Sequence, residues 1–235
     1  MLIGMGYYGF YYDPTYILVI IGAVICMIAS VNVTRTFEKY SRSGCKKGTT
    51  GAEAAATILR NAGITDVRIE HIAGNLTDNY DPRSKVLHLS DSVYGSTSVA
   101  AVGVAAHECG HAIQHQQDYI PIKIRGAIVP VVNLGSKLSW PIIILGLILG
   151  SLNLLNLGII LFALTLVFQI VTLPVEFNAS GRALRILDGS GMLYPDEMKG
   201  ARRVLSAAAM TYVTAVVSTL LQLLRLILLF SRRDD

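Results

Sequence analysis

The sequence predicts a mainly α-helical integral membrane protein with about four transmembrane helices and one small α/β unit. Its 235 residues are 52% hydrophobic and only 15% charged, well away from the average for soluble proteins. Three stretches, 14–34, 138–175 and 204–224, contain no charged residue and are long enough for one, two and one membrane crossings. Between the first two stretches, short runs of alternating hydrophobicity predict strands.

The first segment, 1–34, is expected to form an N-terminal stretch and one transmembrane helix. Tyrosines cluster in residues 1–13, as in the aromatic belt at a membrane surface. No basic residue precedes the apolar stretch, so this is not the start of a signal peptide.

The second segment, 35–136, is predicted to hold the α/β unit. Thr50 and Glu53 match a capping box, which opens a helix that runs to about Asn61 and ends at Gly63. Alternating runs predict two strands, with a loop of turn-forming residues between them. The first strand, the loop and the second strand are expected at 67–72, 74–82 and 85–89.

The strongest functional signal in this segment is His107-Glu108-Cys109-Gly110-His111, an H-E-x-x-H pattern. The Ala- and Val-rich run before it predicts a buried helix, capped by Ser96 or Ser98. The helix should continue to about Tyr119, where Pro121 stops it.

On such a helix, His107 and His111 lie one turn apart on one face, so both can bind one Zn²⁺ ion. Glu108 is then placed to act as general base toward a zinc-activated water. His115, one further turn along, is not expected to bind, because three turns of a straight helix cannot converge on one ion.

A catalytic zinc needs a third protein ligand, and we predict Glu176. Between Tyr119 and Val175 the chain contains no Asp, Glu, His or Cys. Asp118 is the rival, but it lies about 10 Å along the helix axis from His111. The alternative for Glu176 is an ordinary carboxylate at the start of a helix.

The third segment, 137–175, should form a transmembrane hairpin with its turn at 152–158; its first arm can begin before Lys137. The fourth segment, 176–203, carries the third zinc ligand and should open a new helix near Pro174. Ser180, one turn beyond Glu176, is placed to support the metal ligands. The last segment, 204–235, is either a fourth transmembrane helix or a membrane-packed helix, since Arg225 interrupts it.

Basic residues predict the orientation in the membrane. Of the 20 Lys and Arg residues, 12 lie in 35–137 and 5 in 182–203, so 17 belong to one side, which should be the cytoplasm. The zinc ligands belong to the same side. The net charge of +4 comes without a basic run that interleaves aromatics, so nucleic acid is not an expected partner.

Several segments carry a resemblance to a known family. The chain resembles the bacterial membrane-embedded neutral zinc metallopeptidases (YugP-like) and, more distantly, HtpX-like and CAAX-prenyl proteases. In those distant relatives the downstream glutamate opens an E-x-x-A-D segment, whose final Asp is Ser180 here. The resemblance implies a gluzincin-like catalytic unit and a peptidase activity. The matching segments are Tyr80–Arg83, Leu87–Ser90, Ala105–Gln114 and Glu176–Ala183.

The leading hypothesis is a zinc-dependent metalloendopeptidase of the plasma membrane, with one zinc per chain and its active site facing the cytoplasm. Its expected partners are the lipid bilayer, a peptide or membrane-protein substrate, and a regulatory membrane protein of unknown identity. The strand at 85–89 is expected to form the cleft edge that pairs with an extended substrate. Candidates for stabilising the oxyanion are Arg182, Tyr194 and Tyr212.

Two other hypotheses belong to different classes. A zinc-binding scaffold or chaperone would hold a structural zinc, which usually has four protein ligands and no acid placed as a base. A zinc transporter would need more polar residues inside its spans than Asn153, Asn156 and Gln169.

Overall fold

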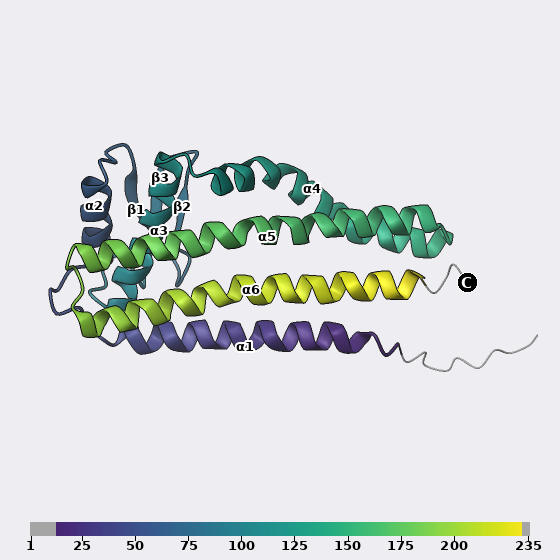
Figure 1. Cartoon of the computed structure of the whole chain (residues 1–235), viewed down its shortest axis with the longest axis horizontal. Coiled ribbons are helices and arrows are strands. Elements are labelled where there is room, and N and C mark those ends of the chain that lie inside the picture. Colours follow the sequence, from purple (N-terminus) through teal and green to yellow (C-terminus); the bar gives the residue numbers. More distant parts are fainter. Residues whose placement is uncertain (1–12, 232–235) are drawn as a thin grey trace, which may run out of the picture.

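The computed structural model describes residues 13–231 and confirms a mainly helical chain with a small sheet. Figure 1 shows the long helices side by side, with the sheet and the two shorter helices gathered at one end. In chain order the elements are α1 (Tyr16–Ser41), α2 (Gly51–Asn61), β1 (Arg68–Ile72), β2 (Asn79–Asp81), β3 (Val86–Ser90), α3 (Val99–Gln116), α4 (Ile120–Leu149), α5 (Leu152–Gly189) and α6 (Pro195–Ser231).

Four helices, α1, α4, α5 and α6, are long and apolar enough to cross a membrane, as the charge-free stretches predicted. α4 packs against α5, α1 packs against α6, and α5 and α6 join the two pairs. Only 11% of the most apolar 18 consecutive residues of α1 are buried, so other parts of the protein leave most of the apolar side chains of α1 uncovered. A helix that is apolar all round and this exposed needs lipid around it.

The turn of the α4–α5 hairpin is shorter and earlier than expected. It consists of Gly150 and Ser151, and the predicted turn at 152–158 is the first part of α5. Gly150 ends α4 because its φ of 62° lies in the left-handed region that glycine adopts without strain. Gly158, which suggested a turn, instead allows close packing: a Cβ there would lie 2.5 Å from Cγ1 of Ile143.

The motif helix ends sooner than expected, and Pro121 has a different role. α3 ends at Gln116, and Asp118 follows with a φ of 56°. Pro121 then lies in the first turn of α4, where its missing N–H costs no helix hydrogen bond. The first arm of the hairpin therefore begins at Ile120, well before Lys137.

No new helix opens near Pro174. α5 runs unbroken from Leu152 to Gly189 with Pro174 inside it. Glu176 consequently lies in the middle of a helix, and the interpretation of it as a helix-start carboxylate is wrong. The second arm of the hairpin extends directly into the segment that carries Glu176.

The sheet has the order β1-β3-β2, with β1 parallel and β2 antiparallel to β3. β2 was missed because a three-residue strand is too short for alternation to show; it lies inside the predicted loop 74–82. The predicted strands at 67–72 and 85–89 are present as β1 and β3. However, β3 is the central strand, so the expectation that it forms the cleft edge is wrong; β1 and β2 are the edge strands.

α3 lies at the centre of the small unit. It packs against α2 and the sheet on one side and against α5 and α6 on the other. Ser98 is its N-cap, accepting a hydrogen bond from the Ala101 N–H at 3.1 Å. The Thr50–Glu53 capping box of α2 is also present.

Arg225 is held at the end of the bundle away from the sheet. Its Nη2 donates to Asp13 Oδ2 at 2.9 Å, and its guanidinium lies 3.9 Å from the ring centroid of Tyr16. A carboxylate and an aromatic face therefore accompany this charge inside the apolar part of α6, as a buried charge requires.

Candidate metal centre

The H-E-x-x-H helix is buried along most of its length. Between Val99 and Gln114, every residue of α3 is buried except Val104 and His107. Gly110 brings α3 close to α5: a Cβ at this position would lie 2.7 Å from the carbonyl oxygen of Ala179. This close crossing places the middle of α5 directly against the two histidines.

Three side chains from these two helices meet. The ligand atoms of His107, His111 and Glu176 all lie within 4.8 Å of one another. Glu176 Oε2 is 3.4 Å from His107 Nε2 and 3.6 Å from His111 Nε2. Glu176 is 2% exposed, and its Oε2 has no hydrogen-bond partner among the described residues. A buried oxygen of this kind is costly unless a cation completes its surroundings.

The donor set fits zinc. Two imidazole nitrogens and one carboxylate oxygen are the ligands of many catalytic zinc sites, which leave the fourth position open. The arrangement takes both histidines from one helix and the glutamate from another. The structure therefore brings together the three residues that were predicted as ligands.

Each histidine is fixed by a contact on its other ring nitrogen. His107 Nδ1 lies 3.1 Å from Ser180 Oγ, so Ser180 occupies the supporting place expected for it. His111 Nδ1 lies 3.0 Å from Oε1 of Gln114. Partners of this kind set the tautomer and the ring orientation of metal-binding histidines.

Gln114 was missed by the sequence reasoning, although it is fully buried and links both helices. Its Nε2 donates to the carbonyl oxygen of Val175 at 2.8 Å and to Asn178 Oδ1 at 3.0 Å. A backbone carbonyl can only accept, so Oε1 of Gln114 must face His111. The N–H of His111 is therefore on Nδ1, and its Nε2 lone pair points to the shared site. The sequence did offer one signal for Gln114: it follows His111 by three residues, a spacing at which two side chains of one helix can contact each other.

Arg125 of α4 is a second residue that the sequence did not reveal. Its Nη1 donates to Glu176 Oε1 at 3.2 Å, so the oxygen that faces away from the histidines is occupied. This ion pair fixes the carboxylate with Oε2 turned toward the histidines. It also ties the beginning of α4 to the site across 51 residues of sequence.

The other candidate ligands lie elsewhere. Asp118 pairs with Lys123 at 2.7 Å, and its side chain is 75% exposed. His115 Nδ1 lies 2.8 Å from the hydroxyl of Tyr80. His71 and His88 contact Asp91 and Asn79. None of these four belongs to the metal cluster that the described residues form.

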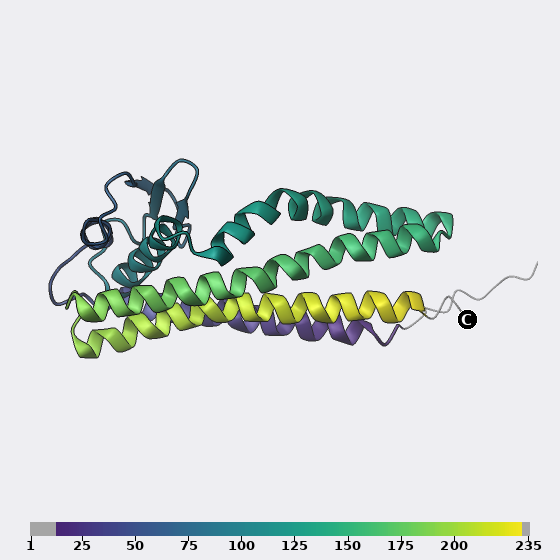
Figure 2. The same cartoon turned by 45° about the horizontal axis from the view of Figure 1, so that its top comes forward.

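A cleft of about 340 Å³ leads to the three side chains. On one side it is lined by the residues of β2 and the turn after it, 78–83, and on the other by the first part of α4. α4 contains Pro130 and Pro141, and Figure 2 shows it bowed away from α5 over its first part. An edge strand of the sheet, β2, therefore lines the cleft.

Glu108 lies in the same cleft and is almost completely buried. Burial raises the pKa of the Glu108 carboxyl, and the neighbouring His107 and His111 act in the opposite direction. A carboxylate with a raised pKa beside the metal ligands is a suitable general base.

Of the three oxyanion candidates, only Tyr212 lines the cleft. Arg182 is engaged with Asn178 and Gln117. Tyr194 lies under the ammonium groups of Lys46 and Lys47, at 5.2 and 6.0 Å from the ring centroid.

Comparisons with known proteins agree with this chemistry. Residues 15–231 match a family described as "Putative neutral zinc metallopeptidase". The chain is also 47% identical to "Putative membrane protease YugP" of Bacillus subtilis (strain 168) over 207 residues, which cover 88% of this chain and 92% of that protein. No solved structure matches the chain. Because the family match covers most of the chain and the relative is similar along nearly its full length, this protein belongs to the neutral zinc metallopeptidase family.

Proposed function

We propose that the protein is a zinc-dependent endopeptidase with a gluzincin-like site, which cleaves membrane or membrane-proximal proteins on the cytoplasmic side of the plasma membrane. The observation that carries the proposal is the convergence of His107 Nε2, His111 Nε2 and Glu176 Oε2 beside Glu108, in a cleft that an edge strand of the sheet lines.

The residues of the site have different roles in the proposed hydrolysis. His107, His111 and Glu176 would hold one zinc per chain, which would make a water acidic near neutral pH and polarise the peptide carbonyl. Glu108 would accept a proton from the attacking water, whose oxygen adds to the carbonyl carbon. When the C–N bond breaks, Glu108 gives the proton to the leaving amine. The Tyr212 hydroxyl, which lines the cleft, is the donor placed to face the developing oxyanion.

The edge strand supports a peptide as the substrate. β2 is an edge strand that pairs with β3, and its residues line the cleft. An extended chain can add to such an edge through its backbone, whatever its side chains. This arrangement suits hydrolysis of an unfolded or extended segment of protein, as an endopeptidase requires.

The test compares the wild-type protein with Glu108→Gln, both full-length and in detergent micelles. The amide cannot take a proton, so cleavage of β-casein should fall by at least about 100-fold while zinc content stays at one per chain. Zinc is measured by elemental analysis of the same samples. If the variant cleaves β-casein at the wild-type rate, the proteolysis comes from a contaminant. The protein would then be a zinc-binding scaffold. Proteomics of membrane fractions with each form would then identify the physiological substrates.

A further inference from the structure

A second cavity lies beside the same site. It has a volume of about 260 Å³ and shares five lining residues with the cleft: Asp78, His107, Glu108, Glu176 and Tyr212. From there it extends between α1, α3 and α6. We call it the apolar cavity; its apolar lining residues are Val33, Phe37, Leu76, Val104, Val204, Leu205, Ala208 and Ala209.

One stripe of α3 runs through both spaces. His111 and Glu108 line the cleft, Glu108 and His107 line both spaces, and Val104, one turn earlier, lines the apolar cavity. Val104 is half-buried within a helix whose neighbouring residues are closed in. The opening beside Val104 explains that exposure. Because the two spaces share the side chains of the candidate metal centre, the apolar cavity lies directly beside that centre.

The lining of the apolar cavity favours an apolar ligand group. α1 contributes Val33 and Phe37, and α6 contributes small residues, Ala208 and Ala209, where larger side chains would fill the space. Asp78, which lines both spaces, accepts hydrogen bonds from the backbone and hydroxyl of Ser90. A charged guest would lose its hydration against the apolar walls of this cavity.

Leu76 is one of the residues that line this cavity. Its side chain is 40% exposed although it is large and apolar, and its φ of 56° is a left-handed conformation that leucine rarely adopts. Strained residues of this kind are found at ligand-binding positions. An exposed leucine held over an apolar opening provides contact area for an apolar guest.

We propose that the apolar cavity binds a large apolar side chain of the substrate, at one fixed position next to the cleaved bond. The inference rests on the proposed peptidase function and names its substrate class: peptide bonds beside residues such as leucine or phenylalanine. The cavity also lies where the apolar stretches of α1 and α6 begin on the side of the sheet. The preferred bonds are therefore at the ends of membrane segments, where apolar and extended sequence meet.

The first test maps cleavage sites. Full-length wild-type protein in detergent micelles digests denatured β-casein, and mass spectrometry identifies the residues on both sides of each cut. Large apolar residues should dominate one position. Ala208→Phe fills the cavity, so cuts beside leucine and phenylalanine should fall by about tenfold or more relative to cuts beside alanine and glycine. Met210→Phe is the matched control, because Met210 lies on the same helix, is exposed and does not line the cavity.

Val33→Phe narrows the cavity from α1 and gives a second variant if Ala208→Phe does not fold. The same change in preference is expected from either variant. An unchanged preference in a folded cavity-filling variant, or a wild-type protein without preference at any position, overturns the proposal.

The second test does not depend on cleavage. Glu108→Gln protein is irradiated with an alanine–serine decapeptide that contains one photoactivatable leucine, and the crosslinked residues are mapped. Crosslinks should fall on the apolar cavity, should be competed by the same peptide with leucine and not by one with serine, and should be lost in Glu108→Gln/Ala208→Phe. Crosslinks elsewhere, or equal competition by the serine peptide, overturn the proposal. If β-casein is not cleaved but the crosslinks appear as expected, the peptidase function fails while the cavity assignment stands.

Discussion

At the scale of single residues, the candidate site is defined by what each polar atom contacts. Each ring nitrogen that faces away from the shared point has a partner, Ser180 for His107 and Gln114 for His111. Glu176 likewise pairs through Oε1 with Arg125, and its Oε2 has no hydrogen-bond partner within residues 13–231. The atoms without partners are therefore the ones that converge, which is the pattern of a metal site.

Glu176→Ala tests the third ligand. Removal of one of three protein ligands should lower zinc affinity by orders of magnitude, because the two remaining histidines cannot complete the site. Competition with a chromophoric chelator measures the affinity of the full-length protein in detergent. Asp118→Ala is the control, and it should bind zinc as the wild type does, since Asp118 pairs with Lys123 at the surface. If the two variants exchange these results, Asp118 is the ligand.

Gln114→Leu tests the positioning of His111. Leucine keeps much of the volume but removes the acceptor from His111 Nδ1 and the donor to the Val175 carbonyl. Loss of such a supporting contact typically lowers metal affinity 10- to 100-fold, so about that loss is expected here. The same chelator competition measures it. Gln116→Leu, an exposed residue of the same helix, should leave the affinity unchanged; equal effects at both positions would refute the positioning role.

At the scale of elements, the site depends on how closely α3 crosses α5. The spacing of the two histidines is a property of one helix, but the distance to Glu176 is set by Gly110, against which the Ala179 carbonyl packs. The continuity of α5 through Pro174 has the same importance. It makes the hairpin arm and the segment with Glu176 one continuous helix, so the membrane part contributes to the position of the ligand.

Gly110→Ala should therefore destabilise the protein although alanine favours helices. The added Cβ would lie 2.7 Å from the Ala179 carbonyl oxygen, and overpacking of this kind costs about 1–3 kcal/mol. Gly181→Ala, on α5 with nothing within 4 Å of its Cβ, should be neutral or stabilising by up to about 1 kcal/mol. Thermal unfolding in detergent compares the two. A lower melting temperature for Gly181→Ala than for Gly110→Ala would contradict the close crossing.

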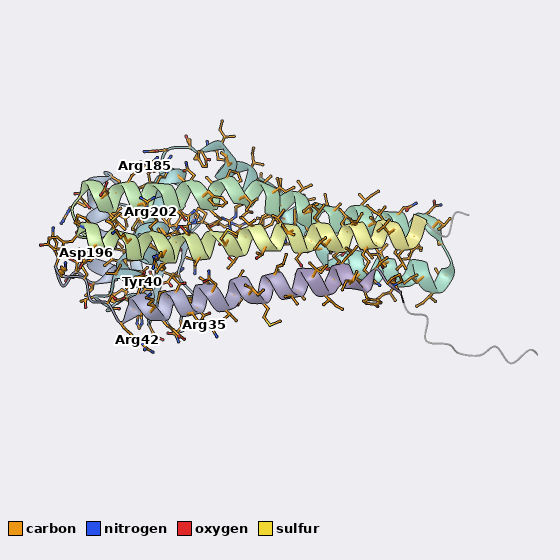
Figure 3. All side chains as sticks on the ribbon, turned by 60° about the horizontal axis from the view of Figure 1, so that its bottom comes forward. Arg35, Tyr40, Arg42, Arg185, Asp196 and Arg202 are labelled. Carbon is orange, nitrogen blue, oxygen red and sulfur yellow. The ribbon has the colours of Figure 1, made fainter. Side chains whose placement is uncertain are left out.

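At the scale of the whole molecule, basic residues and the small sheet lie at the same end of the long helices. Figure 3 shows Arg35, Arg42, Arg185 and Arg202 at one end of the long helices, and Figure 1 shows the sheet at the same end. The spans between that end and the hairpin turn expose apolar side chains. We infer that the basic end faces the cytoplasm, because basic loops are retained on that side.

Reporter fusions test this orientation. A reporter active only outside the cytoplasm should be inactive when fused after Gly44, near the sheet, and active when fused after Asn153, beside the hairpin turn. A cytoplasm-active reporter at the same two positions is the control for expression and should show the opposite pattern. If both patterns are reversed, the site and its substrates lie on the outer side of the membrane.

The sequence alone determined the features that depend on neighbours along the chain. Charge-free length predicted the four apolar helices, capping residues predicted the starts of α2 and α3, and the four-residue spacing placed His107 and His111 on one face. The absence of other donors up to Val175 made Glu176 the candidate. Each of these follows from helix geometry or from the lengths that a membrane requires.

Tertiary structure alone decided which distant groups meet. The three-residue β2 pairs with β3 and takes the edge of the sheet, which no local pattern in so short a strand could reveal. Gly158 allows close packing rather than forming a turn, and Pro174 stays inside α5, because packing outweighs the local preferences of single residues. Gln114 and Arg125 acquire their roles only when α3 and α4 meet α5. A hydrogen-bond partner 51 or 61 residues away leaves no periodic signal, so only the folded chain shows it.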